Sequence, residues 1–352
     1  MIETDALVIG AGPVGLFAVF ELGLQGIAVQ VVDVLDKAGG QCIALYPDKP
    51  IYDIPGVPVC TGRELVGRLL QQVAPFKPAF HLGQQVSTVE QQPDGRWLVS
   101  TTRLQQPCQQ FLARTVIIAA GVGAFVPKEL KLDGLAELLG QQVFYRLAPP
   151  AASAGKHVVI AGGEDEAVAN ALALATDGPG RAQSVTLVHR RDVLQASVEQ
   201  LTELAALRQA GHIHFVAGQI TAVQTADGVL TGVAVNTPDD QTLNLPLDTL
   251  LICMGISPKL GPLTQWGLEM ERKQLCVSLE TFATSAPGIF AVGDVITYPG
   301  KKKLIVSGFH EATLAAFAAA ALIHPDASTV LQYTTSSALL QQRLGVLPTV
   351  NV

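Results

Sequence analysis

The 352-residue sequence is poor in charge and in aromatic side chains. Charged residues make up 15% of the chain and aromatic residues 5%, whereas 49% of the residues are hydrophobic. A chain this apolar can bury a large core, which excludes intrinsic disorder. The 23 basic residues are outnumbered by 30 acidic residues, giving a net charge of −7. This acidic balance argues against nucleic acid as a partner, because nucleic acid requires a basic face.

Cysteine pairs and metal-ligand clusters are also missing. The cysteines stand alone at positions 42, 60, 108, 253 and 276, with no Cys-x-x-Cys motif. This spacing excludes a disulfide scaffold, a structural zinc site and a dithiol redox centre. His212 and His214 are the one close histidine pair, a pattern more typical of a solvated strand edge than of a metal site. We therefore expect no metal.

Targeting and membrane signals are absent as well. The N-terminus carries Glu3 and Asp5 where a signal peptide needs basic residues. The longest apolar run, Leu314 to Ile323, is much shorter than the roughly 20 residues that cross a bilayer. We expect a cytoplasmic protein with no membrane segment.

A dinucleotide-binding unit opens the chain. An apolar strand over 6–9 precedes the turn Gly10-Ala11-Gly12-Pro13-Val14-Gly15, and a helix over 16–24 and a strand over 28–32 follow. Gly10 permits the tight turn, Gly12 lets the backbone approach a pyrophosphate, and Gly15 lets the helix pack on the strand. Asp33, at the end of the second strand, is placed to accept hydrogen bonds from ribose hydroxyls.

A second, altered unit begins about 150 residues later, in agreement with the two domains that the length predicts. A strand over 157–161 leads to the turn Gly162-Gly163-Glu164-Asp165-Glu166, followed by a helix over 168–175 and a strand over 184–188. Glu164 stands where a second glycine is expected, and three acids at this helix start repel a phosphate. Arg190 and Arg191 follow the next strand and can clamp the 2′-phosphate of NADP, although a solvated basic cluster is the alternative.

The remaining segments complete an α/β chain. Strands over 86–102 and 111–119, with a hairpin turn at Pro93-Asp94-Gly95, lie between the units, and another strand covers 249–253. A proline-stiffened loop over 39–56 carries Tyr46, and the residues by themselves fit a ring in ordinary packing equally well.

Together these motifs resemble a thioredoxin-reductase-like ferredoxin (flavodoxin)–NADP reductase over nearly the whole chain. The matching segments are 10–15, 39–55, 121–125, 186–192, 290–311 and 332–336. The resemblance implies two Rossmann-like three-layer domains and a homodimer. The implied boundaries are an FAD-binding domain at 1–120 and 285–325, an NADP(H)-binding domain at 121–284, and a tail at 326–352 that covers the flavin.

The resemblance also assigns roles to individual residues. Tyr46 and Tyr333 would stack on the two flavin faces, and no acid, base or nucleophile is expected. The other residues implied to contact FAD are Gly10, Gly12, Pro13, Gly15, Asp33, Gln41, Val86, Phe125, Asp294 and Thr335. Gly162, Arg190 and Arg191 would contact NADP. A frayed C-terminus is the alternative for the tail.

The implied reaction passes a hydride from NADPH to FAD and single electrons to ferredoxin or flavodoxin. The run Lys301-Lys302-Lys303 is either a solvated face or a patch that steers this acidic carrier. Relatives carry a third glycine and a serine where this chain has Glu164 and Glu166, so we expect weak NADP(H) affinity or a changed nucleotide preference. The alternatives are an FAD-binding relative without a nucleotide site, acting as a sensor or interaction protein, and an NAD(P)H–quinone reductase.

Overall fold

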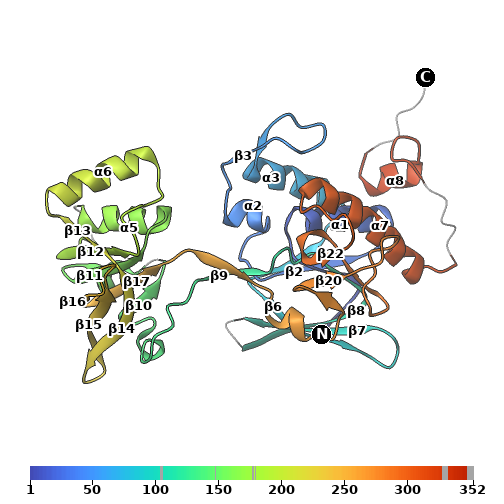
Figure 1. Ribbon diagram of the computed structural model, residues 1–352. Helices are drawn as coiled ribbons and strands as arrows, with labels where there is room; N and C mark the ends of the chain where they lie inside the picture. The colour runs from blue at the N-terminus through green and yellow to red at the C-terminus, as the bar shows by residue number, and fades with distance from the viewer. Residues whose placement is uncertain (104–105, 147, 177, 179, 327–331, 347–352) are drawn as a thin grey trace. The chain divides into compact units, whose positions relative to one another are not determined.

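The computed structural model describes residues 1–103, 106–146, 148–176, 178, 180–326 and 332–346, and it divides the chain into two compact units. Unit 1 comprises residues 1–124 and 258–352, and unit 2 comprises residues 125–257 (Figure 1). The chain crosses between them along strands β9 (Ala124–Pro127) and β18 (Ile256–Lys259), which pair with each other.

A seven-stranded sheet forms the centre of unit 1. Its order is β5-β2-β1-β8-β7-β6. Strand β21 pairs with residues 116–118 of β8, beyond the residues of β8 that pair with β7. The bounds are β1 Ile2–Ile9, β2 Val29–Asp33, β5 Ala79–Leu82, β6 Gln85–Gln91, β7 Trp97–Arg103, β8 Gln106–Ile118 and β21 Ile289–Ala291. The strands β5, β2, β1, β8 and β21 run parallel to one another. Strand β7 runs antiparallel to both of its neighbours, β8 and β6. The carboxyl ends of β1 and β8 therefore meet at one edge.

The described helices of unit 1 are α1 (Pro13–Leu24), α2 (Gln41–Ala44), α3 (Gly62–Val73), α7 (Ile305–Ile323) and α8 (Ala338–Arg343), with 3₁₀ turns η1 (Ala74–Phe76), η3 (Gly261–Gln265) and η4 (Gly293–Val295). Helices α1 and α7 contact the seven-stranded sheet, and the other helices of the unit pack on helices. Short strands complete the unit: β3 (Pro50–Ile51) with β4 (Cys60–Thr61), and β19 (Met270–Glu271) with β20 (Gln274–Cys276) and β22 (Ile296–Thr297).

Helix α7 is long and apolar enough to cross a membrane by length and composition alone, which is weak evidence. It buries Ala312, Ala315, Ala316 and Ala319 in the core of unit 1 and packs beside α1. Small side chains on this face allow the close approach of the two helices.

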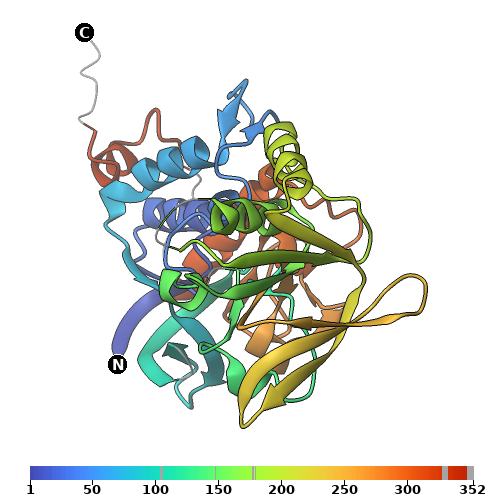
Figure 2. The ribbon, with the colours of Figure 1, turned by 90° about the vertical axis from the view of Figure 1, so that its left-hand side faces the viewer.

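The described residues of unit 2 form two sheets and three helices. A parallel sheet has the order β10-β17-β11-β12-β13, and an antiparallel sheet has the order β14-β15-β16. Helices α5 and α6 lie on the opposite side of the parallel sheet from β14–β16 (Figures 1 and 2). The bounds are β10 Val143–Tyr145, β11 His157–Gly162, β12 Ser184–His189, β13 Ile213–Ala217, β14 Gln219–Ala226, β15 Val229–Asn236, β16 Thr242–Pro246, β17 Thr249–Cys253, α4 Pro150–Ser153, α5 Asp165–Ala175, α6 Val198–Gln209 and η2 Ala136–Leu138.

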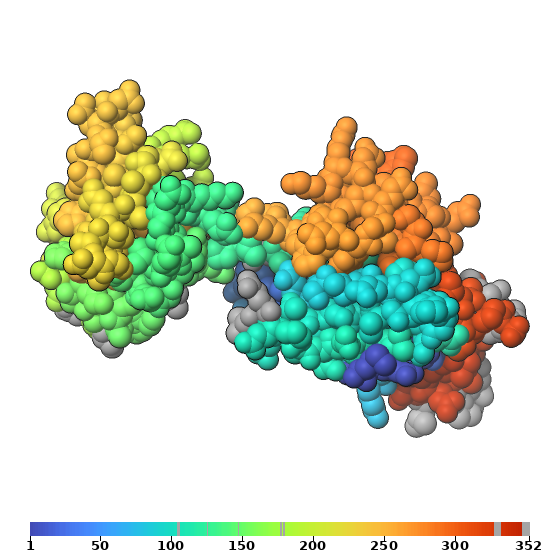
Figure 3. All heavy atoms as spheres, turned by 90° about the horizontal axis from the view of Figure 1, so that it is seen from below, coloured from blue at the N-terminus to red at the C-terminus, as the bar shows by residue number. Residues whose placement is uncertain are grey.

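The return to the first unit differs from the sequence-based boundary. The sequence analysis places residues 258–284 in the second domain, but the structure assigns them to unit 1. Leu263, Leu275 and Phe282 are buried in the core of unit 1, and the Trp266 indole N–H donates to the Ser87 carbonyl at 3.2 Å. Figure 3 shows this segment, in orange, against the cyan strands of the same unit. Burial of these apolar side chains explains the earlier return.

Candidate functional site

The glycine turn after β1 is built from backbone contacts that leave no room for side chains. A Cβ on Gly10 would stand 2.3 Å from the Ala119 carbonyl oxygen at the end of β8, and one on Gly15 would stand 1.9 Å from the Gly10 oxygen. Gly12 has only the Gly40 Cα nearby, at 3.8 Å from its ideal Cβ. The turn is therefore closed on the sheet side and open at Gly12, as a pyrophosphate requires.

Helix α1 begins directly above this opening. Gly12 is its N-cap and provides no side-chain cap, Pro13 occupies the first turn, and the first turn carries no acid. Free N–H groups and the positive end of the helix dipole are thus available to a phosphate. These observations fit the bound dinucleotide that the sequence predicts for unit 1.

Asp33, at the end of β2, is bonded to the same turn. Its side chain is only 8% exposed, and its two carboxylate oxygens accept hydrogen bonds from Ala11 N at 2.6 Å and Leu35 N at 2.8 Å. Burial raises the pKa of the Asp33 carboxyl, while these two N–H donors act in the opposite direction. The carboxylate orients the glycine turn and retains lone pairs for a ribose hydroxyl.

The loop after β2 brings Gln41 and Tyr46 to this region. Gly39 N donates to the Ala11 carbonyl at 2.8 Å, which fixes the start of α2 on the turn. The Gln41 side-chain nitrogen would stand 3.3 Å from a Cβ on Gly121. The Cys42 thiol donates to the Tyr46 hydroxyl at 3.7 Å, and burial raises the pKa of Tyr46. Tyr46 therefore stays a neutral, half-buried ring that packs against the cluster containing Leu16 of α1 and Cys42.

Gly293 and Asp294, after β21, lie against the start of α1. Gly293 has φ +83°, and its ideal Cβ would stand 3.5 Å from a Val14 methyl. The negative charge of Asp294 contributes to the raised pKa of Tyr46, after burial and the Cys42 thiol. The glycine turn, the segment Gln41–Tyr46 and Asp294 thus lie near one another at the carboxyl ends of the parallel strands.

Two further residues predicted to contact FAD, Val86 and Phe125, lie in strands β6 and β9. Val86 is buried near the start of β6, two residues after Gln84, whose N–H donates to the Asp33 carbonyl at 2.9 Å. Phe125 lies in β9, but its side chain is outside the described residues.

Tyr333 and Thr335 are not brought to this place within one chain. Tyr333 is 64% exposed, and its carbonyl accepts hydrogen bonds from Ser336 and Ser337 just before α8. Helix α8 is attached to the far end of α1, because the Arg343 guanidinium donates to the Leu24 carbonyl. Twelve residues of α1, about 18 Å, separate that end from Gly12.

Unit 2 repeats the first glycine contact and replaces the second. A Cβ on Gly162 would stand 2.1 Å from the Cys253 carbonyl oxygen at the end of β17. The Glu164 side chain makes no capping bond and lies over Gly255, whose ideal Cβ would be 2.8 Å from its Oε2. The carboxylate therefore lies in the crevice between the ends of β11 and β17, where parallel sheets bind ligands.

Arg146 is a residue of this crevice that the sequence analysis missed as a ligand candidate. It follows β10 with φ +69°, and its Nε donates to the Glu166 carboxylate at 2.7 Å. One of the three acids at the start of α5 is thus paired. Arg190 and Arg191 are both exposed, and within the described part of the chain neither forms an ion pair.

Lys301 is not part of an exposed basic run, as both a solvated face and a docking patch would require. Its side chain is 6% exposed and forms an ion pair with Glu311, which is fully buried. Only Lys302 and Lys303 are exposed. In the sequence, this pairing is indicated by no more than a single acid in a helix that has no other Asp, Glu, Lys or Arg.

Metal and dithiol chemistry have no candidate residues in the described ranges. No three His, Cys, Asp or Glu side chains there form a cluster that can hold a metal ion. All five cysteines are free thiols.

Residues 4–319 match the model of the pyridine nucleotide-disulphide oxidoreductase family. The chain belongs to this family. It is 57% identical to a protein of Paracidovorax citrulli named ferredoxin–NADP reductase, over 98% of this chain and 97% of that one. A protein of the same name from Albidiferax ferrireducens is 55% identical over 98% and 96% of the two chains. These relatives confirm the resemblance that the sequence motifs predict.

Solved structures confirm the predicted fold class. A thioredoxin reductase of T. acidophilum matches with a TM-score of 0.56 at 21% identity. The match covers 91% of this chain and 99% of the thioredoxin reductase. A bacillithiol disulfide reductase of Staphylococcus aureus has a TM-score of 0.60 at 18% identity, with 90% and 98% covered. The fold is therefore thioredoxin-reductase-like, with two Rossmann-like units.

Gly40→Ala tests the pocket of unit 1. A Cβ on Gly40 would stand 2.9 Å from the Gly12 Cα, so we expect FAD to bind roughly tenfold or more weakly. Gly56→Ala is the matched control, because Gly56 also has positive φ but nothing within 4 Å. Fluorescence of released FAD measures both variants. Equal FAD retention by the two would contradict this assignment of the pocket.

Proposed function

We propose that the protein is a ferredoxin–NADP reductase that uses FAD in unit 1 and NADP(H) in unit 2. The observation that carries the proposal is the pocket of unit 1, where an uncapped α1, the open Gly12 and the buried Asp33 converge. The names of relatives at 55–57% identity over nearly the whole chain support the same activity. Unit 2 supplies a second Rossmann-like sheet and the exposed Arg190 and Arg191 for NADP(H).

Disulfide reduction, the activity named for the structural neighbours, lacks its chemical groups here. The described ranges contain only free, scattered thiols, and strand β10 ends at Tyr145 and is followed by Arg146, with no cysteine pair there. A protein of this fold without a dithiol must pass electrons from its flavin directly to an acceptor. This favours a small electron carrier over a disulfide substrate.

Bound FAD supplies the hydride and single-electron chemistry, and the chain's own residues bind and orient it. Asp33 holds the ribose end, the start of α1 holds the pyrophosphate, and Tyr46 borders the ring. Burial keeps the Tyr46 hydroxyl protonated, so no negative charge from this side chain faces the flavin.

Anaerobic titration with NADPH tests the function. We expect NADPH to bleach the flavin, but only at high nucleotide concentration, because the Glu164 carboxylate lies in the crevice of unit 2. Glu164→Gly should lower the Kd for NADPH roughly tenfold, and Glu164→Gln separates the effect of charge from that of volume.

The outcomes distinguish the alternatives. Fast stoichiometric bleaching of the wild type at micromolar NADPH would contradict weak binding. No bleaching in any of the three proteins, with FAD bound, would overturn the reductase in favour of an FAD-binding sensor or interaction protein. Turnover with quinones and none with ferredoxin would identify a quinone reductase instead.

The exposed Lys302 and Lys303 are proposed to contact the acidic carrier, ferredoxin or flavodoxin. They follow the Gly293–Asp294 turn in sequence, and opposite charge speeds the encounter of electron-transfer partners. Lys302→Glu/Lys303→Glu should raise the KM for ferredoxin roughly tenfold at low salt, without changing flavin reduction by NADPH. Lys77→Glu is the control, because Lys77 follows Phe76 beside Gly23, at the far end of α1. An equal KM for both variants at low salt would contradict this docking surface.

A homodimer is proposed from the place of the tail. Because α8 is attached to the far end of α1, Tyr333 is kept from the flavin pocket of its own chain and is available to that of a second copy. Sedimentation should give twice 37.0 kDa. In heterodimers of Tyr333→Ala with the FAD-deficient Gly40→Ala, the remaining flavin should have the wild-type spectrum. A monomer, or the spectrum of the Tyr333→Ala homodimer, would contradict the exchange. Cytoplasmic location and the absence of a membrane or nucleic-acid partner stay predictions from the sequence.

A further inference from the structure

Glu311 is a fully buried carboxylate with three donors. Its Oε2 accepts from Gly293 N at 2.7 Å, and its Oε1 accepts from the Tyr298 hydroxyl at 2.7 Å and from the Lys301 ammonium. Lys301 also lies 5.6 Å from the centre of the Tyr298 ring. One carboxylate on α7 thus connects the turn after β21 to the loop before α7.

General stability does not explain this pair. Removing two charges from water costs several kcal/mol per ion, and an apolar pair of the same volume is often as stable. The surrounding face of α7 consists of small apolar residues, so the core itself does not require a charge there. The pair therefore indicates that the turn at Gly293 and the loop at Lys301 have to be held in a defined position.

The position that Glu311 fixes is the flavin side of unit 1. Gly293 has φ +83°, its N–H is bonded to Glu311, and its Cα faces Val14 in the first turn of α1. Asp294 is the next residue, in η4. Without an acceptor at Glu311, the buried Gly293 N–H loses its partner and the turn is free to rotate.

We propose that Glu311, neutralised by Lys301 and oriented by Tyr298, is the positioning residue that holds the Gly293–Asp294 turn in the conformation that binds FAD. This inference rests on the proposed use of FAD and adds residues that do not contact it. The same ion pair anchors the loop that carries Lys302 and Lys303, so one contact sets both the cofactor turn and the start of the basic loop.

Three substitutions test the assignment in the holoenzyme. Glu311→Gln and Lys301→Met should each release FAD with a roughly 10- to 100-fold higher Kd, because a charged hydrogen bond is lost or a carboxylate is left without its cation. Tyr298→Phe is milder, with an expected rise of about threefold, and it keeps the test available if the first two fail to fold. In the double variant Lys301→Met/Glu311→Gln, no buried charge is left without a counter-ion and the neutral amide oxygen can accept from Gly293 N, so FAD affinity should recover relative to Lys301→Met alone.

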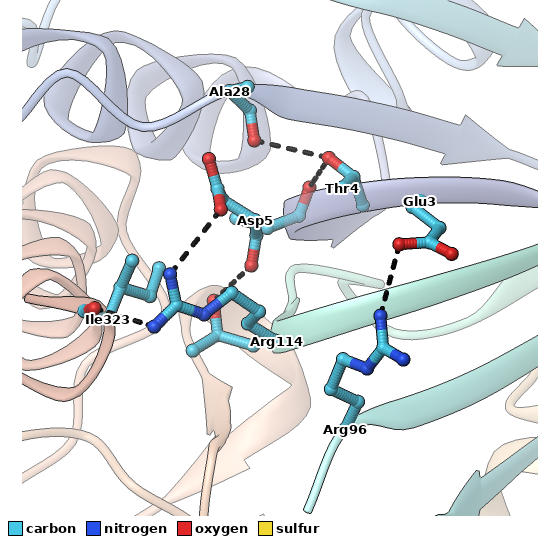
Figure 4. A network of polar contacts seen from close by, with 9 residues as sticks. Glu3, Thr4, Asp5, Ala28, Arg96, Arg114 and Ile323 are labelled. Atoms are coloured by element: carbon cyan, nitrogen blue, oxygen red, sulfur yellow. Dashed lines mark hydrogen bonds and ion pairs between the residues drawn. The ribbon is translucent and has the colours of Figure 1, made fainter. Parts of the chain in front are cut away.

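Arg114 provides the matched control for loss of an α7 contact. Its guanidinium donates to the carbonyl of Ile323, the last residue of α7, at 2.6 Å and lies 3.7 Å from Asp5 (Figure 4). Arg114→Met therefore loosens the other end of the same helix, remote from Gly293. It should lower the thermal unfolding midpoint and leave the Kd for FAD within about twofold of the wild type.

The measurements are FAD fluorescence on release and thermal unfolding of each variant. Weaker FAD binding in the Glu311, Lys301 and Tyr298 variants, with recovery in the double variant, supports the proposal. Wild-type Kd for FAD in Glu311→Gln or Tyr298→Phe, or an equal rise in Arg114→Met, overturns it. A wild-type protein that holds no FAD overturns the proposed function instead. The test measures FAD binding alone and needs neither NADPH nor ferredoxin, so a failure of turnover does not affect it.

Discussion

The structure depends on one backbone contact that occurs in both units. The first glycine of each turn lies against the carbonyl that ends the neighbouring strand: Gly10 against Ala119, and Gly162 against Cys253. A side chain at either glycine would separate two adjacent parallel strands at their carboxyl ends, where a ligand crevice forms. This contact sets the start of α1 and of α5, and the groups at those two starts then decide what each unit can bind.

The two helix starts differ in charge, and that difference separates the units more than the fold does. Helix α1 has no acid in its first turn, whereas α5 begins with Glu164, Asp165 and Glu166. Arg146 neutralises Glu166, and Glu164 is turned over Gly255. The proposed nucleotide site of unit 2 therefore keeps the first glycine contact of unit 1 and has a reduced attraction for phosphate.

Much of the fold was predictable, because short-range patterns determine it. The apolar strands at 157–161, 184–188 and 249–253 lie within two residues of β11, β12 and β17, and the glycine turn located α1. Contacts between distant residues were not predictable. Neither the pairing of Lys301 with Glu311 nor the return of residues 258–284 to unit 1 leaves a local pattern, since each depends on which surfaces meet after folding.

The chain leaves unit 1 along β9 and re-enters it along β18, and these two strands are hydrogen-bonded neighbours. Neighbouring strands lie only about 4.8 Å apart. Unit 2 is therefore an insertion whose two ends meet at one point of the host, so gaining, losing or exchanging it requires no rearrangement of the host sheet. Such a junction lets the proposed nucleotide-binding unit vary while unit 1 keeps its own core and helices.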